Sequence, residues 1–462
     1  MSDSDGVHRR DVLKAGGAAV ALGLVGGGGY FQSLSKNGDS FKSFVGENDV
    51  TQTVCSPNCR GKCLIDVHVR DGQVKKIVPA PPEDEQYKRA CVLGLSHTQR
   101  VYEPTRLKYP MKRADWSPDD PNPTGRGEDA EFERVAWDEA LDLVAEKMQS
   151  LKADHGAESV LFHEGSGNYG QTGKSFKRLA SLFGGTQSAW GIDANVGRGF
   201  NRVTGHGFFL PPTNESEDWK NANTIIVWGS DILSSQFQMD ASKVLDAVEN
   251  GAKLVVVDPA YTTTAAKADL WLPVKPGKDV YLILAMMHTV FEEETYDRTF
   301  LRKRTTAPAL VRKDTGELLQ AADVFGDGSD DQVVAVEAGS GDPVALEPET
   351  EGAYELFGEY TIDGIECETS LTKLRAHAAD YAPEAVTEKV GVDVENIRTA
   401  ARWLATRGPG GIAPGYAIGR YTHGHIFGQA YAIMLAMTGD YGRHGNIHAH
   451  HPGGTTLSAG DW

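Results

Sequence analysis

Four cysteines near the N-terminus have the type and spacing of a metal site. Cys55, Cys59 and Cys63 stand in the run CSPNCRGKC with three residues between neighbours, and Cys91 follows after 27 further residues in RACVLGLS. A tight turn can present three thiolates while a longer loop returns the fourth, and four thiolates are what a [4Fe-4S] cluster requires. Two disulfides and a structural zinc site are the alternatives, although zinc usually takes short C-x2-C pairs. We therefore predict a [4Fe-4S] cluster, and we assign the isolated Cys367 no part in it.

The first 30 residues predict export. Arg9 and Arg10 are followed by Val12, Leu13 and Lys14, and then by a weakly apolar, glycine-rich stretch over residues 15–29. Paired arginines before such a stretch are typical of a twin-arginine signal, which carries folded proteins across the cytoplasmic membrane. We expect the protein on the outer face of that membrane or in a periplasm-equivalent space, with its cofactors inserted before export.

The charge balance is strongly acidic. Asp and Glu number 64 against 46 Lys and Arg, which gives a net charge of −18. This balance argues against a nucleic-acid partner, because binding to a phosphate backbone needs clustered cations. A dense negative surface also keeps proteins soluble in concentrated salt, so we expect a halophilic source.

The remaining chain predicts an α/β protein. Residues 51–112 form a β-rich unit with a hairpin turn at Asp71-Gly72. Beyond residue 130, short apolar strands such as NTIIVWG, AKLVVVDPA and GIAPG alternate with amphipathic stretches such as WDEALDLVAEKMQSLKADHG and ENIRTAARWLATRG. This alternation indicates a parallel sheet wound on both sides. Residues 300–375 have no lasting period and are predicted to form a polar surface insertion.

Glycine-containing loops follow several of the predicted strands. GSGNYG, SDILSSQ and YAIGRYTHG each come directly after one. Loops at the carboxyl ends of parallel strands are where such sheets bind nucleotides. No G-x-G-x-x-G sequence follows a first strand, so an ordinary NAD site is poorly supported. Several such loops suit a large cofactor that carries two nucleotides.

Several segments resemble the dimethyl sulfoxide reductase family of molybdopterin oxidoreductases. They are RVYEPTRLKYPMKR (100–113), VVVDPAYTTTAAKADLWLPVKPGKD (255–279), GYAIGRYTHG and LAMTGDYGRHGN (435–446), and the resemblance runs from about residue 50 to 455. The family fold that this implies is a small β-rich [4Fe-4S] domain followed by doubly wound parallel-sheet domains. We place the iron–sulfur domain at 51–112, a first pterin-binding α/β domain at 113–190 and 395–462, and a second at 191–394 with the insertion 300–375. Family catalytic subunits end in a β-barrel domain, which we expect to be absent from this chain because it stops at Trp462.

The resemblance implies a bis(molybdopterin guanine dinucleotide) cofactor that holds molybdenum or tungsten. Asp258 and Asp279 are expected to accept N–H donors of the guanine, while the threonines of TTT either contact the cofactor or cap a helix. The residues that the resemblance assigns to cofactor binding are Trp228, Gly229, Ser230, Asp231, Asp258, Pro259, Thr262, Thr264, Asp279, Gly419, Arg420, Gly442, His444 and Asn446.

The protein ligand of the metal is expected in AWGIDANVGRGFNRVTG (189–205), which has no Ser or Cys. Asp193 is the candidate catalytic ligand, since a carboxylate is a hard donor for a high-valent metal. An ungapped match puts Ile192 at that position, so a purely structural Asp193 and a ligand role for Asn195 stay open. The resemblance implies that an aspartate ligand favours nitrate, chlorate or selenate reductases and dimethyl sulfide dehydrogenases, whereas an intact Cys55 favours the three-subunit dimethyl sulfoxide reductases.

The function implied by the resemblance is that of an exported catalytic subunit of an anaerobic respiratory reductase. It would take an oxygen atom from a sulfoxide, N-oxide or oxyanion. A membrane anchor and a four-cluster ferredoxin-like subunit would be its partners. The alternatives are an iron–sulfur electron-transfer or scaffold subunit without a functional molybdenum site, and a non-redox hydratase.

Overall fold

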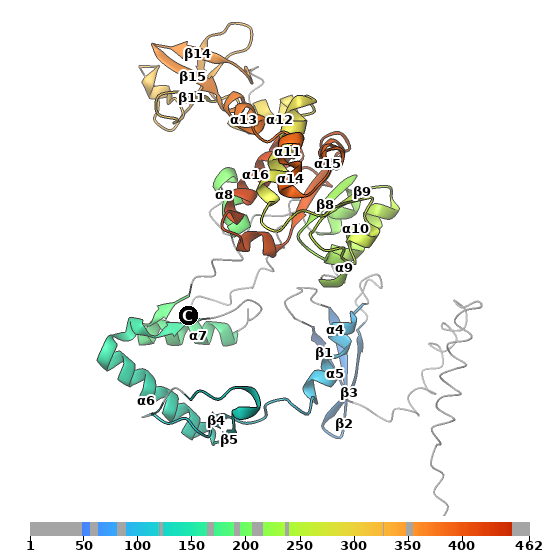
Figure 1. Ribbon diagram of the computed structural model, residues 1–462, viewed down its shortest axis with the longest axis vertical. Helices are drawn as coiled ribbons and strands as arrows, with labels where there is room; N and C mark the ends of the chain where they lie inside the picture. The colour runs from blue at the N-terminus through green and yellow to red at the C-terminus, as the bar shows by residue number, and fades with distance from the viewer. Residues whose placement is uncertain are drawn as a thin grey trace, which may run out of the picture. The chain divides into compact units, whose positions relative to one another are not determined.

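The computed structural model describes residues 49–55, 63–80, 89–118, 120, 123–163, 171–188, 195–205, 216–235, 240–326, 328–347 and 354–445. The predicted signal and the candidate residues Cys59, Asp193 and Asn446 lie outside these ranges. The chain divides into two compact units, Met1–Cys55 with Cys63–Arg106, and Ser56–Lys62 with Leu107–Trp462. Figure 1 labels helices and strands of both units. No helix of the described residues is long and apolar enough to cross a membrane.

The first unit is the predicted small β-rich unit. Its three strands form an antiparallel sheet in the order β1-β2-β3. Asp71 and Gly72 connect β2 to β3 with φ of 53° and 71°, as a two-residue hairpin turn requires, so the predicted hairpin is confirmed. Two short helices follow the sheet in sequence. The elements are β1 (Asp49–Val54), β2 (Leu64–Arg70), β3 (Gln73–Pro79), α4 (Val92–Leu95) and α5 (His97–Val101).

A buried parallel sheet organises the second unit. Its order is β10-β9-β8-β16, from β8 (Thr224–Trp228), β9 (Lys253–Val257), β10 (Leu270–Leu272) and β16 (Gly410–Pro414). Alternate residues of β8 enter two different cores: Ile225 and Val227 pack in one, Ile226 and Trp228 in the other. A strand that is buried on both faces needs helices on both sides, so the predicted doubly wound architecture is confirmed.

This sheet joins two stretches that we assigned to different domains from the sequence. β16 pairs in parallel with β8, from Gly410 opposite Thr224 to Pro414 opposite Trp228. Residues 395–462 and 191–394 therefore each contribute a strand to one sheet, and the domain bounds given above stay a prediction. The cause is that β16 is apolar on both faces, so it is stable beside the equally apolar β8.

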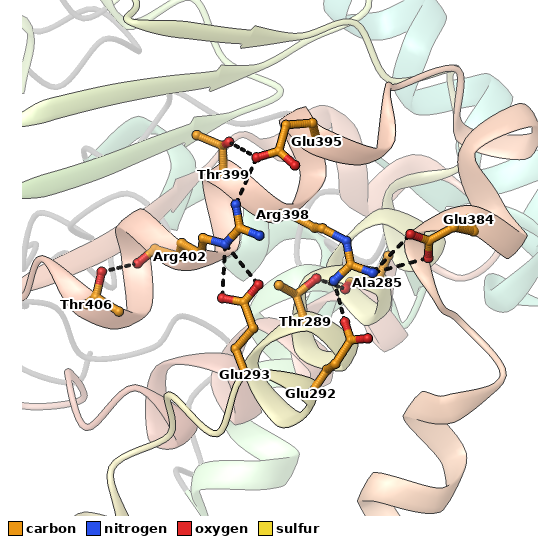
Figure 2. A network of polar contacts seen from close by, with 10 residues as sticks. All are labelled: Ala285, Thr289, Glu292, Glu293, Glu384, Glu395, Arg398, Thr399, Arg402 and Thr406. Carbon is orange, nitrogen blue, oxygen red and sulfur yellow. Dashed lines mark hydrogen bonds and ion pairs between the residues drawn. The ribbon is translucent and has the colours of Figure 1, made fainter.

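The helices of this unit cover the sheet and pack on one another. Gly199 and Gly428 let α8 and α16 approach closely, since an added Cβ would stand 1.8 Å from the His425 carbonyl oxygen and 2.0 Å from that of Val196. Ion pairs tie α15 to α11 and α14 (Figure 2). The helices are α8 (Asn195–Thr204), α9 (Ile232–Ser235), α10 (Asp240–Glu249), α11 (Asp279–Glu292), α12 (Arg298–Arg304), α13 (Ser370–Ala379), α14 (Pro383–Val390), α15 (Val394–Thr406) and α16 (Gly424–Met437), with the 3-10 turns η4 (Ser216–Asn221), η5 (Ala265–Lys267) and η7 (Tyr416–Arg420).

The predicted polar insertion contains a small β structure with its own core. Leu310, Leu319, Val334, Ile362 and Cys367 meet in that core, although residues 310–369 hold sixteen acidic side chains and two basic ones. We call residues 310–369 the acidic β module. Its apolar runs are only three or four residues long, which is why its sequence shows no period. Its elements are β11 (Leu310–Arg312), η6 (Ala321–Asp323), β12 (Val334–Val336), β13 (Pro343–Ala345), β14 (Glu359–Ile362) and β15 (Ile365–Thr369).

We call the first unit the cysteine unit. The stretch of sequence between it and α8 contains one long helix and short strands. The helix predicted over WDEALDLVAEKMQSLKADHG is α6 (Trp137–His155), which ends at Gly156 with φ of 87°. The other elements are β4 (Met111–Arg113), η2 (Gly127–Asp129), β5 (Phe132–Arg134), η3 (Ala157–Ser159), β6 (Leu161–Phe162), α7 (Gln171–Phe183) and β7 (Thr186–Gln187).

Candidate cofactor-binding sites

Three of the four predicted cluster cysteines come to one end of the antiparallel sheet. Cys55 follows β1, and its N–H donates to the carbonyl of Cys63, which precedes β2, at 2.8 Å. Cys91 is the N-cap of α4, and Gly94 of that helix lies against Cys55: an added Cβ would stand 3.2 Å from its sulfur. Cys55, Cys63 and the start of α4 therefore lie near one another.

The donor chemistry at this end suits an iron–sulfur cluster. Cys55, Cys63 and Cys91 are thiols rather than disulfides, and Gly94 leaves room beside the sulfur of Cys55. Within the described ranges, no three His, Cys, Asp or Glu side chains lie close enough together to hold a metal ion. Cys59, the fourth predicted ligand, lies outside those ranges. The assignment of all four sulfurs therefore stays a prediction.

A second candidate site is a pocket of about 280 Å³ beside the parallel sheet. It is lined by residues 276–280, which follow β10 and begin α11, and by Ile418, Tyr421–Gly424 and Phe427, which follow β16 and begin α16. Lys278 and His423 are the N-cap residues, and neither side chain caps its helix. Two helix N-termini and a lysine therefore border one cavity, which favours a bound anion such as a phosphate.

Asp279 gives this pocket a buried carboxylate as well. The indole Nε1–H of Trp228, at the end of β8, donates to Asp279 Oδ1 at 2.8 Å. Burial raises the pKa of Asp279, while the hydrogen bond from Trp228 acts against that rise by stabilising the carboxylate. Trp228 is itself completely buried, so its side chain serves to hold Asp279.

Glycines let the loops after β8 and β16 meet beside the pocket. Gly229 has φ of 61°, and an added Cβ would stand 3.0 Å from Ile418, a residue of the pocket wall. An added Cβ at Gly415 would stand 2.0 Å from the carbonyl oxygen of Gly229. The glycine predicted at 229 is therefore required by backbone geometry.

Asp231 and Thr264 connect the loop after β8 to the loop after β9. Asp231 Oδ1 accepts from Thr264 N at 2.9 Å and from Thr264 Oγ1 at 2.6 Å, and Thr264 Oγ1 accepts from Leu233 N at 3.1 Å. Thr264 is fully buried. Asp231 and Thr264 therefore connect two loops inside the protein. Their mutual hydrogen bonds compete with the cofactor contacts predicted for both side chains. Ser230, between Gly229 and Asp231, is half-buried.

The loop after β9, which lies in the segment VVVDPAYTTTAAKADLWLPVKPGKD, is held by local hydrogen bonds. Asp258 Oδ1 accepts from Ala260 N at 2.8 Å, and the Asp258 carbonyl accepts from Trp271 Nε1 at 2.9 Å. Thr262 Oγ1 accepts from the N–H of Ala265, the first residue of η5, at 3.1 Å. Pro259 is exposed. The cofactor roles of these residues stay predictions.

The remaining predicted residues lie in two places. Gly419 is buried in η7, where its carbonyl accepts from Asn195 Nδ2 at 2.9 Å, and Arg420 beside it is exposed. His444 Nδ1 pairs with Asp218 Oδ1 at 2.6 Å, whereas Gly442 is exposed with φ of 73°. The amide of Asn195 therefore helps to position η7, a role that no pattern in the sequence indicates.

Lys278 of the pocket was also missed in the sequence analysis, although a basic residue directly before Asp279 at a helix start could have indicated it.

A buried carboxylate lies at the opposite end of β16. Asp440 accepts from Gly410 N at 3.1 Å and from Thr438 Oγ1 at 2.8 Å. Burial raises the pKa of Asp440 to about 6, although both hydrogen bonds favour its charged form. This group lies at the amino end of the strand, and it does not line the pocket.

Two family sequence models match almost the whole chain. The molybdopterin oxidoreductase model matches residues 106–456, and the molybdopterin oxidoreductase Fe4S4 domain model matches residues 48–103. The second range contains all four predicted cluster cysteines, and the first contains the pocket. These matches imply a molybdopterin cofactor and a [4Fe-4S] cluster.

Known relatives extend beyond the length of this chain. The "Putative dimethyl sulfoxide reductase catalytic subunit" of Halobacterium salinarum is 57% identical over 100% of this chain and 56% of its own length. The alpha subunit of the dimethylsulfide dehydrogenase of Rhodovulum sulfidophilum is 30% identical over 84% of this chain and 43% of its own length. The alpha subunit of the respiratory nitrate reductase of Haloferax mediterranei is 28% identical over 98% of this chain and 50% of its own. The chain thus spans about half the length of these relatives.

A solved structure has a similar fold. Acetylene hydratase from Pelobacter acetylenicus superposes with a TM-score of 0.55 over 84% of this chain and 43% of its own, at 21% sequence identity. Identity at that level supports the shared α/β architecture alone.

Proposed function

The chain belongs to the molybdopterin oxidoreductase family, and from this premise we propose that it is the catalytic portion of an exported respiratory reductase. The proposed reaction removes an oxygen atom from a sulfoxide, N-oxide or oxyanion, with two electrons and two protons, and releases water. The pocket between the N-termini of α11 and α16 carries this proposal, because it offers both phosphate-binding groups and a carboxylate at the edge of the sheet where nucleotides bind.

The pocket residues suit the dinucleotide arms of a bis(molybdopterin guanine dinucleotide). The N–H groups that open α11 and α16, together with Lys278, would hold phosphates. Asp279, kept in place by Trp228, would accept N–H groups of a base. When bound, such a cofactor supplies oxygen-atom transfer at its molybdenum or tungsten. We propose Asp193 as the protein ligand of that metal.

The cysteine unit would supply electrons one at a time. Cys55, Cys59, Cys63 and Cys91 are the proposed cluster ligands, and the match of residues 48–103 to an Fe4S4 domain supports them. A membrane anchor and a ferredoxin-like subunit are the proposed partners. Export through the N-terminal signal and work in high salt are proposed as well, from the paired arginines and the net charge of −18.

Metal content and turnover of the full-length protein test this function. Protein purified anaerobically is expected to hold molybdenum or tungsten, a pterin and about four irons per chain. It should oxidise reduced methyl viologen with dimethyl sulfoxide, trimethylamine N-oxide, nitrate or chlorate as acceptor. Iron without molybdenum, tungsten or pterin would instead identify an electron-transfer or scaffold subunit. Turnover without any electron donor would identify a hydratase.

A further inference from the structure

Cys55 has a histidine against its sulfur. Its Sγ lies 3.6 Å from Nε2 of His97, and Cys55 is only 7% exposed. His97 is the first residue of α5, and the end of that helix is tied to β3 because Tyr102 Oη accepts from Val74 N at 2.7 Å. Gly94 borders the same sulfur on α4. The sulfur is therefore fixed between two elements of the first unit.

The chemistry of a cluster ligand decides the direction of this contact. A cysteine that binds iron is a thiolate and has no proton to donate. The contact then requires the proton on Nε2 of His97, so that N–H donates to sulfur. A donor at a sulfur that is nine-tenths buried has little competition from water, which strengthens the interaction.

We propose that His97 raises the reduction potential of the [4Fe-4S] cluster by donating this hydrogen bond to Cys55. A reduced cluster carries one more negative charge than an oxidised one, and the charge is spread over its sulfurs. A hydrogen bond to a ligand sulfur therefore stabilises the reduced form more than the oxidised form. His97 is thus a positioning and tuning residue, and this inference rests on the proposed cluster.

The test is an anaerobic redox titration of the full-length protein followed by electron paramagnetic resonance. His97→Phe is expected to lower the ratio of reduced to oxidised cluster at a fixed potential about tenfold, which corresponds to about 59 mV for one electron. His97→Gln keeps an N–H donor and is expected to recover most of that shift. His68→Gln is the matched control, because His68 lies within β2 opposite Val50 and Lys76. Iron per chain, measured in each variant, separates a change in potential from a loss of the cluster.

A second measurement tests the proposal even if the His97 variants fail to bind iron, because it does not need them. In protein with ¹⁵N-labelled histidine, pulsed electron paramagnetic resonance of the reduced cluster should show a weak coupling to a histidine nitrogen. The same coupling should be present in His68→Gln. A coupling as strong as that of a direct iron ligand would overturn the proposal, and so would the absence of any coupling. Equal shifts in His97→Phe and His97→Gln, or no shift in either, would overturn it too. None of these outcomes depends on molybdenum, so they are separate from failure of the proposed reductase activity.

Discussion

The cysteine end of the first unit and the pocket of the parallel sheet differ in what would hold a ligand. At the cysteine end, covalent bonds from a few side chains on a turn and a loop would carry the site. At the pocket, strand ends and the N-termini of α11 and α16 carry it, with Lys278 and Asp279 in support. A site of the first kind should fail when one side chain is lost, whereas a site built from backbone should weaken by degrees.

The two regions also differ in how their surroundings stabilise them. The strands behind the pocket are buried on both faces in two hydrophobic cores. The cysteine unit is a three-stranded sheet on which Val50 and Val54 are about half exposed. Cluster binding would therefore contribute to the stability of the cysteine unit itself, as metals do in small domains.

The largest expected effect is that of Cys91→Ser. Serine is a favourable N-cap for α4, so the helix start is kept while the thiolate is lost. We expect most of the iron to be lost from the protein, with far-ultraviolet circular dichroism of the sheet unit unchanged. Iron content by mass spectrometry is the measurement.

Cys367→Ser is the matched control for that experiment. Cys367 is fully buried in the core of the acidic β module. A hydroxyl there costs about 1–3 kcal/mol of stability, yet iron content should stay at the level of the unsubstituted protein. If Cys91→Ser retains all its iron, or Cys367→Ser loses it, the cluster assignment is wrong.

The next effect concerns the buried Asp440 at the amino end of β16. Its pKa is raised from 3.8 to about 6, so the folded state binds a proton that the unfolded state has already released. The stabilisation that this proton gives the folded state is complete below about pH 4 and is lost as the pH rises to about 6. The loss amounts to roughly 3 kcal/mol.

Asp440→Asn removes that titration. The variant should match the unsubstituted protein at pH 4 and exceed it in free energy of unfolding at pH 7, as measured by urea unfolding. Asn can still accept from Gly410 N, which limits the structural change. A constant difference between the two proteins from pH 4 to pH 7 would refute the raised pKa.

A smaller effect is expected for Lys278→Gln in the pocket. The helix N–H groups remain, so affinity for GDP should fall by about tenfold, or about 1.4 kcal/mol, rather than vanish. Calorimetry on full-length protein produced without molybdopterin measures this affinity. Lys267→Gln, on the exposed surface of η5, is the control and should leave the affinity unchanged. Complete loss of GDP binding in Lys278→Gln would show that the pocket depends on one side chain, as the cysteine end does.

Local features of both regions could be predicted from the sequence, whereas contacts between distant segments could not. The strand NTIIVWG, the long helix α6 and the Asp71-Gly72 hairpin were predictable because local periodicity and turn chemistry specify them. The pairing of β16 with β8 was not, since residues 186 positions apart meet only in the folded sheet. The same holds for Trp228 with Asp279 and Asn195 with Gly419, whose contacts cross different elements. The acidic β module was missed because its apolar runs are too short to show a period.

The smallest effect is expected from the ion pairs that join α15 to its neighbours (Figure 2). Arg402 Nε lies 2.9 Å from Glu293 Oε1 after α11, and Arg402 Nη1 lies 2.8 Å from Glu395 Oε1 within α15. Arg402 is 40% exposed, so water and salt screen both pairs. Arg402→Gln should therefore lower the free energy of unfolding by less than about 1 kcal/mol at about 0.1 M salt.

High salt should remove most of that difference. Urea unfolding of Arg402→Gln and of the unsubstituted protein, in about 0.1 M and about 3 M KCl, should give a gap that nearly closes at the higher concentration because the Debye length falls to about 3 Å by 1 M. Arg407→Gln, on the residue after α15, is the control for removal of one positive charge nearby. A gap that stays open at the higher salt concentration would mean that Arg402 acts through the packing of its side-chain stem rather than its charge. The stability of the sheet region would then depend on the packing of individual surface side chains as well as on its two buried cores. The sheet region would in that respect resemble the cysteine end, which depends on a few side chains.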